Sequence, residues 1–142
     1  KDNVVPGNVR LLLDFRIHPG MDHEQVGQFL DKGFEQAGID GFRRTLHFYM
    51  PGGEIPQDDR FVKLCLEERE RQFGIKSDPQ PFDASCEQCF LAREGIQTVI
   101  CGPGDIAQAH TVGEFTWEKQ VRDAVSLYER IIDRVLYKTN YI

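Results

Sequence analysis

The residues best suited to chemistry in this sequence gather in one stretch, CGPGDIAQAHTVGEF, which covers residues 101–115. His110 lies just past a Gly-Pro-Gly turn, and Glu114 follows it closely. An imidazole can bind a metal ion or transfer a proton, but both tasks need several groups that converge on one point. Nothing near His110 in the sequence completes such a site. Two interpretations follow: a loop histidine beside a solvated glutamate, which spacing alone favours, and a metal ligand whose partners lie elsewhere.

The cysteines offer a second candidate for metal chemistry. Cys86 and Cys89 have the Cys-x-x-Cys spacing, and with Cys101 and His110 they could form a zinc site of three thiolates and one imidazole. However, the second half of such a site usually repeats the short spacing, and here it does not. A redox pair is a further alternative. Buried or coincidental thiols are the simpler interpretation, and they fit a reducing, cytoplasmic location.

Arg16 is a candidate for anion binding. It belongs to the polar face of a segment in which apolar and polar residues alternate, next to Asp14. A planar guanidinium on a rigid strand can grip a carboxylate through two parallel hydrogen bonds. An exposed strand arginine is more often solvated or loosely paired. The other histidines, His18, His23 and His47, are expected to be structural or solvated.

Three elements are expected to position Arg16. Residues 9–17 alternate with period two, which is typical of a strand with one buried face. Asp22 and Gln25 have the spacing of a capping box, so they predict the start of a helix that closes near Gly38. Residues 41–50 alternate again and predict a second strand. Strand, helix and strand in this order suggest half of an α/β sandwich.

The stretch PGGEIPQDD is the clearest boundary in the sequence, because prolines and glycines punctuate it. It divides the chain into residues 1–51 and residues 52–142. The second part predicts a helix that Asp58 or Asp59 caps and that stops at Gly74, a short helix that ends at Gly95, a buried strand at residues 97–101 and a long helix that Thr116 caps. The predicted fold class is therefore α/β.

Composition excludes several kinds of partner. The chain has 142 residues, of which 40% are hydrophobic and 28% charged, so it is globular in type. Its formal net charge of −6 argues against nucleic acid and against an anionic membrane surface, because both need a basic face. No apolar stretch approaches the length of a membrane span. Small molecules and other proteins remain as partners.

Two segments resemble a known enzyme family. The stretch NVVPGNVRLLLDFRIHPG, residues 3–20, is similar to the signature strand of the lid, or dimerisation, domain in acetylornithine deacetylases and succinyl-diaminopimelate desuccinylases. The stretch GIQTVICGPGDIAQAHTVGEF, residues 95–115, is similar to the last metal-ligand segment of these dinuclear metallo-aminoacylases. The order and separation of the two segments fit the family. Departures from the family pattern lie at Gln97, at Gly113 and at residues 85–89.

The resemblance implies a fold and a division of labour. Residues 1–51 would be part of the lid domain, with strand, helix and strand, and residues 52–142 the C-terminal part of an α/β zinc-peptidase-like catalytic domain. The chain would then be a C-terminal fragment of a longer protein. The remaining metal ligands and the general base would lie upstream, so the chain alone is expected to be inactive and to bind no metal.

The resemblance also implies a reaction and roles for particular residues. The intact enzyme would remove an acyl group from an N-acyl amino acid with two divalent metal ions, zinc or cobalt, and would form a homodimer through the lid domain. His110 would bind one of the metals, Arg16 and Asn3 would grip the substrate carboxylate, and Gly102 and Gly104 would line the pocket. The alternative is a non-catalytic dimerisation or binding module that derives from the same family.

Overall fold

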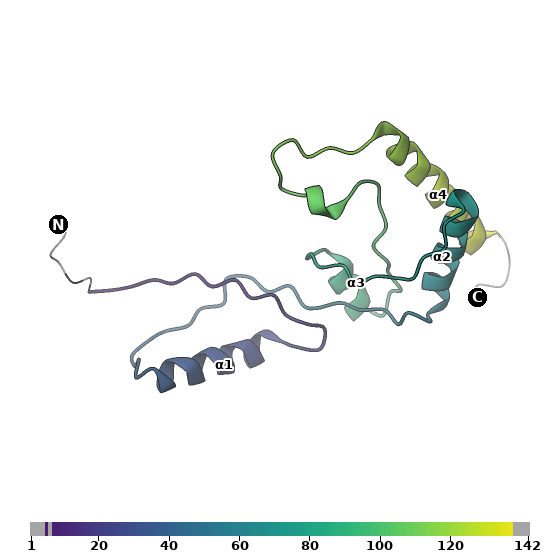
Figure 1. Ribbon diagram of the computed structural model, residues 1–142. Helices are drawn as coiled ribbons and strands as arrows, with labels where there is room; N and C mark the ends of the chain where they lie inside the picture. The colour runs from purple at the N-terminus through teal and green to yellow at the C-terminus, as the bar shows by residue number, and fades with distance from the viewer. Residues whose placement is uncertain (1–4, 6, 138–142) are drawn as a thin grey trace. The chain divides into compact units, whose positions relative to one another are not determined.

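The structure, a computed structural model, describes residue 5 and residues 7–137. The chain divides into two compact units, Lys1–Gly52 and Gly53–Ile142. The described part of the chain holds helices joined by irregular segments (Figure 1).

Among its described residues, the first unit contains one helix, α1, over His23–Gln36. The predicted capping box is confirmed: the amide of Gln25 donates to Asp22 Oδ1 at 2.9 Å, and the amide of Asp22 donates to Gln25 Oε1 at 3.0 Å. The helix ends where Gly38 takes a φ of 69° and the amide of Ile39 donates to the carbonyl of Phe34 at 2.9 Å. Both ends are therefore set by local hydrogen bonds.

Contacts from residues 42–49 hold the chain that follows α1 against the helix. The guanidinium of Arg44 binds both carboxylate oxygens of Asp31 at 3.1 Å each, and a side chain at Gly27 would overlap that guanidinium. The rings of Phe34 and Phe42 lie 4.8 Å apart. A bidentate pair of this geometry fixes direction as well as distance.

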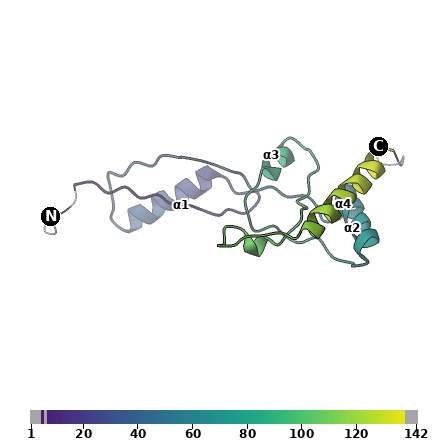
Figure 2. The same ribbon diagram turned by 90° about the horizontal axis from the view of Figure 1, so that it is seen from above.

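In the second unit, α2 covers Arg60–Phe73 and α4 covers Glu118–Leu136. The two helices pack against each other, and Figures 1 and 2 show them side by side. Val62, Leu64 and Leu127 are buried in this unit. Asp59 caps α2 by accepting the amide of Phe61 at 2.7 Å, as one of the two predicted caps.

A buried carboxylate lies between α2 and α4. Glu68 is 3% exposed, and its Oε1 accepts from Arg71 at 2.7 Å and from Arg134 at 3.0 Å. Arg134 also binds Glu67 at 2.6 Å, and the hydrogen bonds to both glutamates raise the pKa of its guanidinium. Charge that is removed from water needs such partners, so this network ties the two helices together.

The remaining helices are short. Helix α3 covers Gln88–Arg93, and the 3₁₀ turn η1 covers Ile106–Gln108. The prediction that Thr116 caps α4 is wrong by one residue, because Trp117 is the N-cap. The amide of Trp117 donates to Gln120 Oε1 at 3.2 Å, so a side chain inside the first turn satisfies the cap.

The predicted α/β fold class is wrong for this structure. No strand occurs among residues 7–137, and the predicted strands at residues 9–17, 41–50 and 97–101 are irregular segments. A strand exists only where its backbone groups pair with a neighbouring strand. Within the described residues, every backbone hydrogen bond outside the helices joins residues at most five positions apart. Alternation of side chains therefore occurs here without the pairing that makes a sheet.

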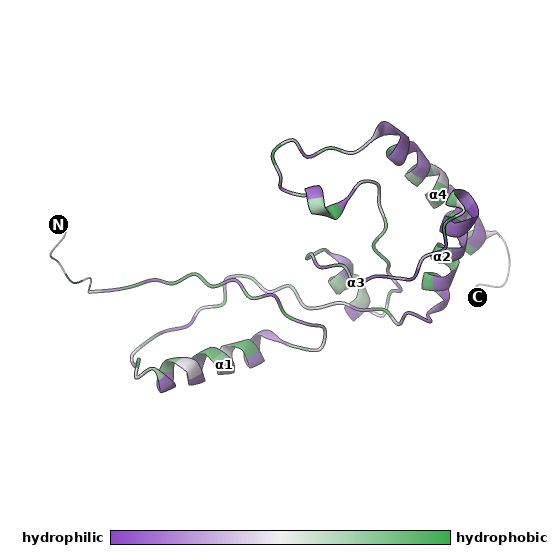
Figure 3. Cartoon of the chain, viewed as in Figure 1, coloured by the Kyte–Doolittle hydropathy of each residue, from purple (hydrophilic) through white to green (hydrophobic). Residues whose placement is uncertain are grey.

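Many apolar side chains consequently stay exposed. In the first unit Leu11 is 65% and Phe48 73% exposed, and in the second unit Val125 on α4 is 52% exposed. Both α1 and α4 are amphipathic, so each has an apolar stripe. Figure 3 shows hydrophobic and hydrophilic residues alternating along each helix. No helix in the described part of the chain combines the length and the apolar character that crossing a bilayer requires.

Candidate functional site

Helix α4 positions the start of the loop that carries His110. The hydroxyl of Tyr128 donates to the backbone carbonyl of Cys101 at 2.7 Å. A side chain added at Gly102 would come within 3.9 Å of that hydroxyl. Desolvation and the neighbouring Cys101 raise the pKa of Tyr128, so its phenol stays protonated and remains a donor. The first half of the glycine-rich turn is therefore fastened to the middle of α4.

Gly104 ends that turn in a conformation that other residues rarely adopt. Its φ is 95°, and an added Cβ would lie 3.3 Å from Thr116 Oγ1. Thr116 stands just before α4. The turn therefore needs a glycine here for two reasons, the backbone angle and the close approach of a neighbouring side chain.

The next residues form a loop around η1 that hydrogen bonds between its own residues hold together. Figure 1 draws η1 as the short green turn on the chain that runs from α3 to α4. Asp105 caps η1 by accepting the amide of Ala107 at 2.9 Å. The hydroxyl of Thr111 donates to the carbonyl of Gln108 at 2.7 Å. Local side chains thus form hydrogen bonds with backbone groups that would pair with other backbone groups in a regular helix or strand.

His110 has the most unusual backbone in this loop. Its φ is 63°, and it is the one non-glycine residue with a positive φ in the described part of the chain. Its amide donates to Glu114 Oε2 at 3.0 Å. The residue is exposed, and no hydrogen bond between its ring and another described residue occurs. Both ring nitrogens are therefore without a hydrogen-bond partner among the described residues.

The other predicted site residues fall into two groups. Gly102 and Gly104 share the loop of His110. Arg16 belongs to the first unit, where it is exposed and contacts Asp14 at 3.5 Å. Asn3 lies outside the described residues. The predicted metal ligand and the two glycines thus belong to one loop, whereas Arg16 belongs to the other unit.

The cysteines do not form the alternative zinc site. The described residues contain no group of three or more histidine, cysteine, aspartate or glutamate side chains able to hold a metal ion. Cys89 is buried, and its Sγ donates to the carbonyl of Cys86 at 3.2 Å. Burial raises the pKa of the Cys65 thiol to about 11. Desolvation also raises the pKa of the Cys101 thiol, although the residue as a whole is exposed. Protonated thiols of this kind are poor nucleophiles and poor metal ligands.

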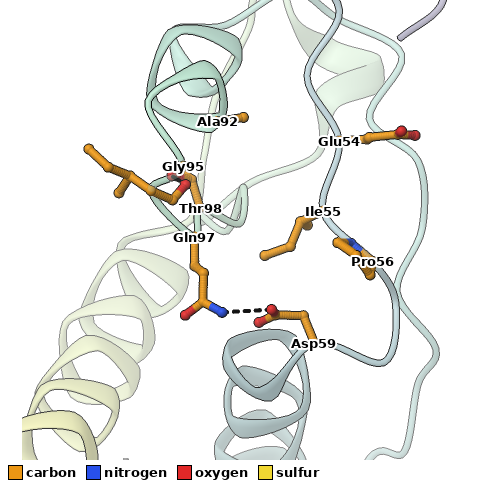
Figure 4. Close-up of a pocket in the computed structure, with 9 residues that line it drawn as sticks. Glu54, Ile55, Pro56, Asp59, Ala92, Gly95, Gln97 and Thr98 are labelled. Carbon is orange, nitrogen blue, oxygen red and sulfur yellow. Dashed lines mark hydrogen bonds between the residues drawn. The ribbon is translucent and has the colours of Figure 1, made fainter. Parts of the chain in front are cut away.

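A shallow pocket lies in the second unit, away from His110 in the sequence. Its volume is about 160 Å³. Figure 4 shows the side chain of Gln97 directed at Asp59, to which it donates at 2.7 Å. Asp59 thus caps α2 with one oxygen and binds Gln97 with the other. The lining combines two carboxylates with apolar and backbone groups: Glu54, Ile55, Pro56, Asp59, Ala92, Gly95, Ile96, Gln97 and Thr98.

Sequence reasoning missed two residues that shape the His110 loop. The sequence motifs do not single out Tyr128, and the pattern around His110 predicts a solvated Glu114. For Tyr128 a signal existed, because a tyrosine on an apolar stripe needs a partner for its hydroxyl. For Glu114 the spacing to His110 was visible, but the hydrogen bond runs to the backbone, which no spacing rule indicates.

Comparison with known proteins adds evidence of a different kind. The sequence profile of peptidase family M20/M25/M40 matches residues 10–134. Acetylornithine deacetylase of Myxococcus xanthus is 26% identical over 80% of this chain and 29% of its own length. The enzymes of the same name from Photorhabdus laumondii and Pectobacterium carotovorum are 24% and 26% identical, over 97% and 92% of this chain and 35% and 33% of their own lengths.

The chain thus spans about a third of the length of the curated relatives it matches. No solved structure matches it significantly. The profile covers most of the chain and includes both the segment of Arg16 and the loop of His110. On this evidence, the chain belongs to peptidase family M20/M25/M40.

Proposed function

We propose that this chain contributes to a metal-dependent amidohydrolase that removes an acyl group from an N-acyl amino acid, with His110 as one metal ligand. The chain belongs to a hydrolase family whose enzymes generally depend on two metal ions. Curated relatives named acetylornithine deacetylase favour an acetylated amino acid as the substrate class. The observation that carries the proposal is the exposed position of His110. Its backbone has a positive φ, and its loop is held by hydrogen bonds between its own residues.

The residues of the loop fit one position in a metal site. The His110 ring is exposed and makes no hydrogen bond to another described residue, so a ring nitrogen can donate its lone pair to a cation. The described residues offer no cluster of three ligands. One imidazole alone does not hold zinc, because protein zinc sites use three or four protein ligands. The proposal therefore places the other ligands outside this chain segment.

Each of the remaining predicted residues has a role in the proposal. The metal ions, zinc or cobalt, would supply Lewis-acid chemistry at the scissile amide. Arg16 would bind the substrate carboxylate through its planar guanidinium, and Asn3 would assist. Gly102 and Gly104 would let the backbone of the turn approach the substrate closely, because neither carries a side chain. Self-association through residues 1–51, as in a lid domain, completes the proposal.

A second candidate function rests on a separate observation. The first unit exposes large apolar side chains, including Val9 at 76% and Leu12 at 80%. Such exposure is unusual for a protein without a partner. A non-catalytic dimerisation or binding module would use these side chains for association and would have no use for the His110 loop.

One experiment separates the two candidates. Full-length protein from the same gene is prepared as wild type, His110→Ala and His47→Ala, dialysed, and analysed for zinc and cobalt and for acetate release from an N-acetyl amino acid. Substitution of a residue that hydrogen-bonds a metal ligand typically lowers activity by about 10–100-fold. Loss of the ligand itself in His110→Ala should lower activity by more than that and should remove metal. His47 is exposed, and His47→Ala should match the wild type. Equal metal content and activity in all three proteins would contradict the role of His110.

A further inference from the structure

The backbone of His110 has a conformation that residues other than glycine adopt uncommonly, although histidine adopts it more often than most. A φ of 63° lies in the left-handed region, where the Cβ of an L-residue crowds its own backbone. Such outliers persist only when their surroundings over-determine them. The surroundings of His110 must therefore contain a group that stabilises this conformation.

Glu114 supplies that group. Its Oε2 accepts the amide of His110 at 3.0 Å, and its own amide donates to the carbonyl of Thr111 at 3.3 Å. Gly113 has a φ of 84°, which lets the chain turn back so that the carboxylate reaches the amide. A hydrogen bond from a backbone amide to a carboxylate is stronger than one between neutral groups.

We propose that Glu114 is a positioning residue, which holds His110 in the left-handed conformation and thereby fixes the direction of its imidazole. The Cα–Cβ bond of a residue changes direction relative to the chain when φ changes sign. Without the carboxylate, His110 would relax to a negative φ, and its ring would leave the position in which the loop presents it. The carboxylate acts on the backbone amide, so it leaves both ring nitrogens available.

The inference rests on the proposed function only where it concerns a metal, namely that the fixed imidazole is a ligand. The positioning itself is a property of the 142-residue chain and can be measured without any metal. The backbone conformation of residue 110 and the affinity of the protein for zinc are therefore measured in separate experiments.

The first test uses NMR on the isotopically labelled 142-residue chain as wild type, Glu114→Gln, Glu114→Ala and Glu118→Ala. A positive φ gives a strong intraresidue NOE between the amide and α protons. We expect this signal at His110 in the wild type, in Glu114→Gln, which keeps a carbonyl acceptor, and in Glu118→Ala. In Glu114→Ala the signal should weaken, and the amide of His110 should exchange about tenfold faster, the equivalent of one lost hydrogen bond. Unchanged resonances of α2 and α4 show that each variant folds.

A His110 that keeps its positive φ and slow exchange in Glu114→Ala would overturn the proposal, as would a negative φ in the wild type. In the variant His110→Gly the added substitution Glu114→Ala should change the loop little, because glycine needs no support at this angle.

The second test measures zinc affinity of the full-length protein by competition with a chelator. Glu114→Ala should weaken zinc binding about 10–100-fold, and Glu114→Gln should restore most of the loss. Equal affinity in the wild type and Glu114→Ala would overturn the orienting role. If His110→Ala leaves zinc affinity unchanged, the proposed function fails and the metal part of this inference fails with it, whereas the NMR result stands independently.

Discussion

The hydroxyl of Tyr128 and the backbone carbonyl of Cys101 are joined by a hydrogen bond of 2.7 Å, across 27 positions of sequence. Through this contact the glycine-rich turn is attached to α4, the longest helix among the described residues. The same helix also packs against α2. One helix therefore supports both the small core of the second unit and the loop that presents His110.

Removal of that hydroxyl should loosen the turn without disturbing the core. Tyr128→Phe keeps the ring and loses one hydrogen bond, so the free energy of unfolding should fall by about 0.5–1.5 kcal/mol. Urea denaturation followed by circular dichroism measures the change. Tyr137→Phe serves as the control, because Tyr137 is 74% exposed, and it should match the wild type. Equal stability of the two variants would show that the bond to Cys101 contributes nothing.

Gly104 should tolerate substitution far less than a glycine in open space. Alanine at a φ of 95° is strained, and its Cβ would approach Thr116, so Gly104→Ala should cost about 1–3 kcal/mol. Gly7→Ala is the matched control, because nothing lies within 4 Å of the added Cβ, and it should change stability by less than about 0.5 kcal/mol. Thermal unfolding of both variants decides the matter, and similar losses would contradict the assignment of strain to Gly104.

The two faces of α4 should respond differently to truncation. Leu127 is 4% exposed and Val125 is 52% exposed. Leu127→Ala leaves a cavity and should destabilise the chain by about 2–5 kcal/mol, whereas Val125→Ala should cost less than about 0.5 kcal/mol. Denaturant midpoints of the two variants test this. A large loss in Val125→Ala would mean that the exposed stripe of α4 is covered by a partner in solution.

The buried Glu68 should matter more for stability than an exposed glutamate on α4. Glu68→Ala leaves Arg134 and Arg71 without their shared acceptor, and breaking a fully buried pair costs about 3–5 kcal/mol. Because the Arg71 side chain is 58% exposed, water can replace part of the interaction. We therefore expect the free energy of unfolding to fall by about 3 kcal/mol or less. Glu129→Ala, at an exposed position, is the control and should be neutral in the same unfolding experiment.

Stability should fall in alkaline solution because of Cys65. Burial raises the pKa of this thiol from its ordinary value of 9.0 to about 11. Between these values the unfolded chain releases the proton while the folded chain retains it, so the free energy of unfolding decreases as pH rises. Cys101 and Tyr128 shift in the same direction. Urea midpoints measured from pH 8 upward should therefore decline less steeply, but still decline, in Cys65→Ala; an identical slope would exclude Cys65 as a source.

The helices could be predicted from the sequence because their determinants are local. Asp22 with Gln25 at the start of α1, and Asp59 and Gly74 at the two ends of α2, act within a few residues of the backbone groups they satisfy. The predicted strands failed because alternation specifies which side chains share a face and says nothing about a pairing partner. Residues 9–17 have the pattern of a strand, but among the described residues no backbone hydrogen bond pairs them with another segment.

The same distinction applies to the candidate site. His110 and the glycines of its turn were identified because they belong to one continuous motif. The support from Tyr128 was not identified, because Tyr128 belongs to a helix that lies far along the chain from this motif. Neither was the role of Glu114, because the positive φ of His110 depends on the three-dimensional course of the loop. A histidine is enriched at such angles relative to most residues, but sequence alone does not say which histidine adopts one.

The irregular segment at residues 9–17 should affect how the chain is degraded by proteases. Figure 1 shows it as an irregular, drawn-out run, and it carries Arg10 and Arg16 at exposed positions. Proteases of the trypsin type accept their substrates in extended form and cut after arginine, and they attack exposed backbone that few internal bonds protect. Cleavage should therefore begin in this segment, well before α2 and α4 unfold. A binding partner that covers the segment would then set the rate at which the protein is degraded in a cell.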